Sequence, residues 1–117
     1  MQIYFHTPYI QLDPKFKDHV ARRLEGLLKF FSEDVRAYVD IESTNGQHRG
    51  DDIFYCSIKL ESSGQVYFTE EYQSSIRISF DHSYGEMFRV VRSDRSRSRR
   101  LGRRAAQKIK RIFKRHK

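Results

Sequence analysis

Residues 12–42 read LDPKFKDHVARRLEGLLKFFSEDVRAYVDIE, and this stretch decides the fold because its hydrophobic period changes once. Asp13 and Pro14 are typical of a helix start, since the carboxylate can accept first-turn N–H groups and proline fits the first helical position. Apolar residues then recur at three-to-four spacing and predict a helix of about four turns. They are Phe16, Val20, Leu24, Leu27, Leu28 and Phe31. From Val35 to Glu42 the period becomes two, which predicts a half-buried strand.

Alternation also predicts strands on both sides of this stretch. Near the start, Ile3 and Phe5 share one face of a strand. After a polar loop over residues 43–52, the inward face of a further strand is predicted. It comprises Phe54, Cys56, Ile58 and Leu60.

The segment from residue 62 to residue 80 leaves two alternatives for the strands. Ser62-Ser63-Gly64 predicts a hairpin turn, with the chain returning through an inward Val66 and Phe68. Residues 76–80 alternate again through Ile76, Ile78 and Phe80. Residues 65–80 therefore form either one long bulged strand or two strands.

A second helix is predicted to open at Ser83, because Ser83 and Glu86 have the spacing of a capping box. Its apolar stripe ends near Val91 and is interrupted at Asp94. A continuous helix from residue 84 to residue 115 would span about 48 Å at 1.5 Å per residue, so we expect its basic end to project. We therefore expect one α+β domain over residues 1–92 and a basic helical extension over residues 93–117.

The order of these elements is β-α-β-β-β-α, and the strands alternate rather than being uniformly apolar. This pattern predicts an α+β fold, in which a mainly antiparallel sheet has two helices packed on one face.

Charge is distributed unevenly along the chain. Residues 85–117 contain fourteen basic and two acidic residues, a net charge of +12, whereas residues 1–84 have a net charge of −4. Arginine outnumbers lysine ten to four in the basic segment, which favours bidentate contact with phosphate. The segment is either a nucleic-acid-binding arm or a solvated charged tail. We favour the arm, because so many cations repel one another without an anion.

The candidate RNA-binding residues lie on both helices and on the arm. They are Arg22, Arg23, Lys29, Arg89, Arg92, Arg95, Arg99, Arg100, Arg103, Arg104 and Lys108. Each cation of the first helix has an alternative interpretation as a plain exposed residue. Tyr38, Tyr55 and Tyr67 could form an outward set that stacks on bases, although cross-strand packing is the more common role of such residues.

The residues give no basis for catalysis, a metal site or a cofactor. The single cysteine, Cys56, alternates with apolar neighbours, as a small core residue would. The five histidines have no metal-ligand spacing, and no glycine loop or hydrolytic triad is present. No apolar run approaches the ~20 residues of a membrane span. We expect a cytoplasmic protein that has no small-molecule substrate and no membrane partner.

The order of motifs resembles the bacterial ribosome hibernation promoting factor and ribosome-associated inhibitor family. Met1-Gln2-Ile3, the Leu12-Asp13-Pro14 helix start with its apolar stripe, and the strand over residues 35–42 carry the resemblance. It implies a fold similar to a double-stranded-RNA-binding domain. It also implies binding to 16S rRNA in the mRNA and tRNA channel of the small ribosomal subunit, with translation blocked in stationary or stressed cells and no catalysis.

The chain departs from the family pattern between its last strand and its second helix. Glu70 to Ser79 is longer than the family's usual turn, so the family's basic positions are not carried over one by one. The second domain of the longer members is missing, which resembles a short form. Two other classes remain. One is a general binder of structured RNA or nucleoid DNA. The other is a membrane-surface or protein-partner adaptor, whose membrane version the broken stripe at residues 94–98 disfavours.

Overall fold

The computed structural model describes residues 1–44 and 54–101, and the side chains of residues 96–101 are outside that description. The elements, in chain order, are β1 (Gln2–His6), α1 (Pro14–Glu25), the 3-10 turn η1 (Leu28–Phe30), β2 (Arg36–Ser43), β3 (Phe54–Ser62), β4 (Gln65–Gln73) and α2 (Ile76–Leu101).

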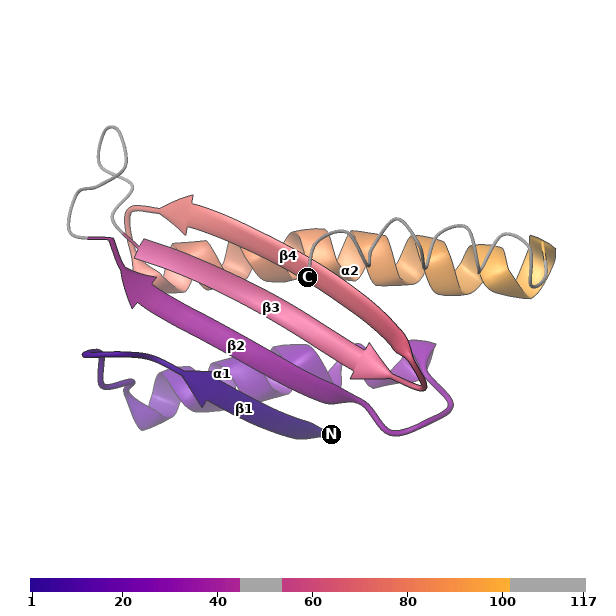
Figure 1. Ribbon diagram of the computed structural model, residues 1–117, viewed down its shortest axis with the longest axis horizontal. Helices are drawn as coiled ribbons and strands as arrows, with labels where there is room; N and C mark the ends of the chain where they lie inside the picture. Colours follow the sequence, from indigo (N-terminus) through magenta and orange to yellow (C-terminus); the bar gives the residue numbers. More distant parts are fainter. Residues whose placement is uncertain (45–53, 102–117) are drawn as a thin grey trace.

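The four strands form one sheet in the order β1-β2-β3-β4. β1 is parallel to β2, and the other two pairings are antiparallel. Both helices lie on the same face of the sheet (Figure 1). The predicted α+β class and the order β-α-β-β-β-α are confirmed.

The core fills the space between the sheet and this helical layer. Val20 and Leu24 of α1, Val39 and Ile58 of the sheet, and Met87 of α2 are all fully buried. Their burial follows from the two periods in the sequence, since a helix stripe and one face of each strand can cover each other. Phe54, at the first position of β3, is only half-buried.

The first helix is shorter than predicted. Asp13 caps it as expected, with its carboxylate accepting a hydrogen bond from Lys15 N at 3.0 Å. The helix ends at Gly26, and the apolar stripe continues through η1 rather than through a fourth helical turn. A Cβ at Gly26 would lie 3.2 Å from the Arg23 carbonyl oxygen of α1, which is a tight contact, and at an ordinary 3.7 Å from the Tyr84 hydroxyl of α2.

The hairpin between β3 and β4 has a two-residue loop, and this loop overturns the predicted facing of β4. Ser63 and Gly64 have φ values of 49° and 80°, and Ser62 pairs with Gln65. Leu60 is consequently opposite Tyr67, so Tyr67 lies on the helical face of the sheet and is 1% exposed. Val66 and Phe68 were expected inside, but they lie on the other face because a one-residue shift in register exchanges the two faces.

The second helix begins at Ile76, so residues 76–80 are neither part of a long bulged strand nor a fifth strand. Ser75 starts the helix, with its hydroxyl accepting a hydrogen bond from Ile78 N at 3.1 Å. The apparent alternation misled because Ile78 is 41% exposed whereas Phe80 is fully buried. Ser83, the predicted cap, is buried within the helix, where its hydroxyl lies 2.9 Å from Thr69 Oγ1 of β4.

The interruption of the apolar stripe at Asp94 and Arg95 is a place where α2 is fixed to the sheet. Asp94 is 2% exposed and accepts a hydrogen bond from the buried Tyr67 hydroxyl. Arg95 donates to the Phe30 carbonyl oxygen at 3.0 Å and also to the Gln65 side chain. The domain boundary after residue 92 stays a prediction, but α2 keeps tertiary contacts past it. The last turns of α2 then extend past the hairpin between β3 and β4 (Figure 1).

Candidate nucleic-acid interface

Two cations from the end of α1 and from η1 rest on aromatic rings of α2. The Arg23 guanidinium carbon lies 5.2 Å from the centre of the Tyr84 ring. Lys29 Nζ lies 5.7 Å from the Phe88 ring and 5.4 Å from the Phe30 ring. Because Tyr84 and Phe88 are one helical turn apart, these contacts line up both cations along the seam between the two helices.

The neighbouring surface of α2 adds further cations. Arg92 follows Phe88 by four residues, so it lies on the same side of the helix and is exposed. Arg89 is exposed one residue after Phe88, and its Nη1 lies 3.8 Å from the position of a Cβ on Gly85. A larger residue at position 85 would therefore touch this guanidinium.

We call this surface the helical basic patch. It comprises Arg23, Lys29, Arg89 and Arg92, together with Arg22, which is exposed on α1 next to Arg23 in the sequence. Among the residues that the structure describes, none of these five cations forms a salt bridge with a carboxylate. Their charge is therefore directed at solvent, as an anion-binding surface requires.

The remaining predicted RNA-binding residues fall into three groups. Arg95 is occupied inside the protein, with its guanidinium 4.6 Å from the centre of the Phe31 ring and its donors on Phe30 and Gln65. Arg99 and Arg100 belong to α2, but their side chains are outside the described part. Arg103, Arg104 and Lys108 lie wholly outside the described residues. For all of these cations, RNA contact stays a prediction.

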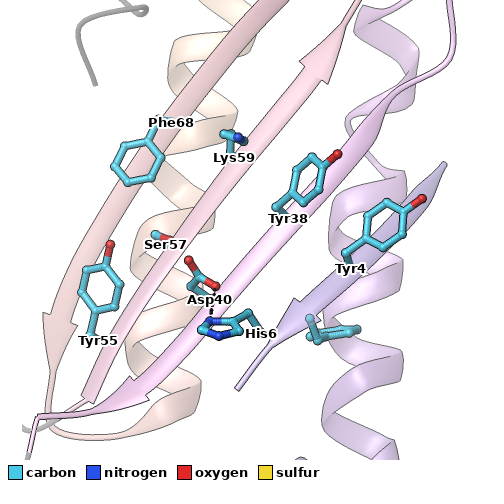
Figure 2. Close-up of a pocket in the computed structure, with 9 residues that line it drawn as sticks. Tyr4, His6, Tyr38, Asp40, Tyr55, Ser57, Lys59 and Phe68 are labelled. Atoms are coloured by element: carbon cyan, nitrogen blue, oxygen red, sulfur yellow. Dashed lines mark ion pairs between the residues drawn. The ribbon is translucent and has the colours of Figure 1, made fainter. Parts of the chain in front are cut away.

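The face of the sheet away from the helices is called the open face here. Its side chains are Gln2, Tyr4, His6, Arg36, Tyr38, Asp40, Glu42, Tyr55, Ser57, Lys59, Glu61, Val66, Phe68, Glu70 and Tyr72. Figure 2 shows a group of them on the side of the sheet opposite the helices. Four carboxylates and two cations make this face acidic, in contrast to the helical basic patch.

The predicted outward tyrosine set is only partly present. Tyr38 and Tyr55 lie on the open face, and Tyr38 stacks on Tyr4 at a centroid distance of 5.2 Å. Tyr67 is instead buried under α2, where burial and Asp94 raise the pKa of its hydroxyl. The aromatic residue of β4 on the open face is Phe68. If Ser63 and Gly64 had been taken as a two-residue hairpin loop, the sequence would have predicted Phe68, and not Tyr67, on the open face.

The consecutive acidic residues Glu70 and Glu71 are divided between the two faces of the sheet, while Asp51 and Asp52 are outside the described residues. Glu70 lies on the open face, whereas Glu71 faces α2. Burial, together with the hydrogen bond and charge of Glu71, raises the pKa of Glu86 above its usual value. This carboxylate pair is on the β4 side of α2, and the charge of Arg89, a member of the helical basic patch, acts in the opposite direction and lowers the pKa of Glu86.

The described residues give no support for a reactive cysteine, a metal site or a membrane-spanning helix. Cys56 is fully buried, and burial raises the pKa of its thiol to about 12, so it is a core residue. Across residues 1–44 and 54–101, no three His, Cys, Asp or Glu side chains gather as a metal site would need. No helix in these ranges combines the length and apolarity needed to cross a membrane.

Comparison with known proteins agrees with this architecture. Residues 3–99 match the family model described as Sigma 54 modulation protein / S30EA ribosomal protein. The fold is similar to the crystal structure of the N-terminal domain of Protein Y from Thermus thermophilus, with a TM-score of 0.65 and 17% sequence identity. That similarity covers 78% of this chain and 96% of the other.

None of the curated proteins compared with the chain matches it by sequence. The family match spans most of the chain and confirms the resemblance drawn from residues 1–43. The chain belongs to the Sigma 54 modulation protein / S30EA ribosomal protein family and is a ribosome-associated modulation factor of the hibernation type.

Proposed function

We propose that the protein silences translation by binding 16S rRNA in the mRNA and tRNA channel of the small ribosomal subunit, without catalysis. The observation that carries this proposal is the helical basic patch, in which cations from two helices and a turn converge on one side of the domain. The acidic open face would then be turned away from the RNA.

The patch suits structured RNA for physical reasons. A-form RNA is recognised mainly through its phosphates and 2′-hydroxyl groups, which a rigid surface can follow. Tyr84 and Phe88 hold Arg23 and Lys29 in place before any ligand binds. This preorganisation reduces the side-chain entropy that binding would cost. The eleven basic residues that follow residue 95 in the sequence add to this charge.

Binding should depend steeply on salt, because each neutralised phosphate releases condensed counterions. The direct measurement is sedimentation of purified protein with isolated small subunits through sucrose at several salt concentrations. We expect binding at about 50 mM salt and loss of binding as salt rises. Absence of co-sedimentation at the low concentration would contradict the proposal.

A pair of matched variants tests which surface is responsible. Arg89→Glu/Arg92→Glu reverses two patch cations, and Lys15→Glu/Lys17→Glu makes the same charge change at the opposite end of the helical layer. All four residues are exposed, so neither variant removes core packing. Each lost phosphate contact should lower the salt slope by about one unit, so the patch variant should lose about two units and the control almost none.

A cell-free translation assay adds the functional readout. The wild type and the Lys15/Lys17 variant should inhibit protein synthesis, and the Arg89/Arg92 variant should not. Equal loss in both variants would mean that overall charge, rather than the patch, drives binding. Equal affinity for small subunits and for a DNA duplex of similar charge would indicate a general nucleic-acid binder.

A further inference from the structure

The open face of the sheet contains a shallow concavity that the RNA-binding surface does not use. Its volume is about 490 Å³, and side chains from all four strands line it. Four rings form its walls, those of Tyr4, Tyr38, Tyr55 and Phe68, and Asp40 lies between them (Figure 2).

Strand register arranges these side chains in rows across the sheet. Tyr4, Tyr38, Lys59 and Phe68 are successive partners in one row. His6, Asp40, Ser57 and Glu70 form the next row. Glu42, Tyr55 and Tyr72 form a third, in which the two rings have centroids 4.9 Å apart. A row that contains two carboxylates therefore lies between two rows that each contain at least two aromatic rings.

The protein already places one of its own cations on this surface. Lys59 Nζ lies 5.0 Å from the centre of the Tyr38 ring and 3.4 Å from a Glu61 carboxylate oxygen. Arg36, the other cation of the open face, also pairs with Glu61, at 3.3 Å. Partial burial on its own raises the pKa of Glu61, but these two cations together lower it. A ring and a carboxylate thus hold a cation at the edge of the concavity.

Among the described residues, the side-chain partners of the two carboxylates nearer the centre are a histidine and a tyrosine. Asp40 Oδ1 lies 3.0 Å from Nδ1 of the exposed His6, and Glu70 accepts a hydrogen bond from the Tyr55 hydroxyl at 2.9 Å. Both positions keep acceptor capacity, since an ionised carboxylate has about four lone-pair sites. Negative charge here repels nucleic acid, although the flat rings alone would also suit stacked bases.

We propose that the open face binds an extended arginine-rich segment of a partner protein. Guanidinium groups stack on aromatic rings and form two-pronged hydrogen bonds with carboxylates, and this surface offers both within one concavity. Alternate side chains of an extended peptide are spaced about 6.6–6.8 Å apart, which is also the spacing of the rows along each strand. This binding is independent of the RNA contact proposed for the helices.

The test uses the full chain and a fluorescein-labelled octapeptide of alternating arginine and serine. Binding is followed by fluorescence anisotropy at about 0.1 M salt, where charges more than about 10 Å apart are largely screened. The chain as a whole carries a net charge of +8, so it repels the peptide unless a local acidic site binds it. We expect saturable binding, and weaker binding of the corresponding lysine-serine peptide because lysine does not stack as a plane.

Matched variants then locate the site. Asp40→Asn/Glu70→Gln should raise the dissociation constant about tenfold, because charge-assisted hydrogen bonds become neutral ones. Asp18→Asn/Glu25→Gln removes the same charge from exposed positions of α1 and should change affinity less than about twofold. Tyr4→Leu/Tyr38→Leu should also weaken binding by removing the stacking surface. If the Tyr4/Tyr38 variant unfolds, the comparison of the two carboxylate variants alone tests the proposed site.

Three results would overturn the proposal. One is the absence of saturable peptide binding, and another is an equal loss in the two carboxylate variants. The third is binding of an oligouridine that is lost in the Tyr4/Tyr38 variant while peptide affinity stays unchanged, which would assign the open face to single-stranded RNA.

Discussion

Replacing Tyr67 by phenylalanine should destabilise the domain strongly, although it removes only one oxygen atom. Tyr67 is 1% exposed, and its hydroxyl donates to Asp94, which is itself 2% exposed. The substitution leaves the ring in place beside Phe31. The lost free energy therefore reports on the hydrogen bonds of the hydroxyl, with the buried Asp94 carboxylate and with Arg95, rather than on a cavity.

The expected magnitude follows from this burial. A hydrogen bond to a charged group contributes about 1.5–3 kcal/mol, and a buried carboxylate that loses a donor also keeps its desolvation cost. We expect a loss of about 2–3 kcal/mol in the free energy of unfolding. At about 4 °C per kcal/mol for a domain of this size, Tm should fall by about 8–12 °C.

Urea denaturation of the wild type and of two variants measures this effect. Tyr4→Phe makes the same chemical change at a residue that is 47% exposed, where the hydroxyl donates to Gln2 Oε1 at 2.8 Å. That control should lose less than about 0.5 kcal/mol, as most surface substitutions do. A double-mutant cycle with Asp94→Asn should give a coupling of about 1–3 kcal/mol. If Tyr67→Phe costs no more than Tyr4→Phe, Asp94 does not fix α2 to the sheet through this bond.

Three further outcomes are expected. Glu86→Gln should raise Tm at pH 7 more than at pH 4, because the pKa of Glu86 is raised in the folded protein. The protonated carboxyl contributes stability below the unfolded pKa of 4.5, and this stability is lost as pH rises through the folded pKa. Melting both proteins between pH 4 and pH 7 checks this trend. Leu24→Ala should cost about 2–5 kcal/mol in urea denaturation and Phe54→Ala clearly less, because Leu24 is fully buried and Phe54 is half-buried; an equal loss would contradict this account of the core. Cys56 should react with a thiol reagent at pH 7.5 only as fast as the fold opens, because the thiol is buried with a pKa of about 12, and fast labelling without urea would refute this.

Predictions from sequence succeeded wherever a single period ran uninterrupted. The stripe from Phe16 to Leu24 and the alternation from Val35 to Glu42 each allow only one way to bury apolar side chains. The start of α1 at Asp13-Pro14 was equally well determined, because the cap needs only local atoms. The start of α2 was not determined, because the apolar residues of 76–80 fit both a strand period and a helix period and because Ser83 has the spacing of a capping residue although it lies inside the helix.

For the candidate binding surfaces, too, some features were visible in the sequence and others depended on the tertiary structure. The excess of arginine near the C-terminal end is visible in the sequence, and it predicts an anion-binding segment. The sequence did not show that Arg95 is used internally, that Arg23 and Lys29 rest on rings of α2, or that Phe68 replaces Tyr67 on the open face. Each of these depends on partners far along the chain.

By itself, then, the sequence determined the elements, their order and the polarity of charge, because periodicity, caps and composition act over a few neighbouring residues. Only the tertiary structure decided which side chains face which way across β4 and along the end of α2. The register of a hairpin and the burial of Asp94 are settled by contacts between strand and helix, where a shift of one residue exchanges solvent for core.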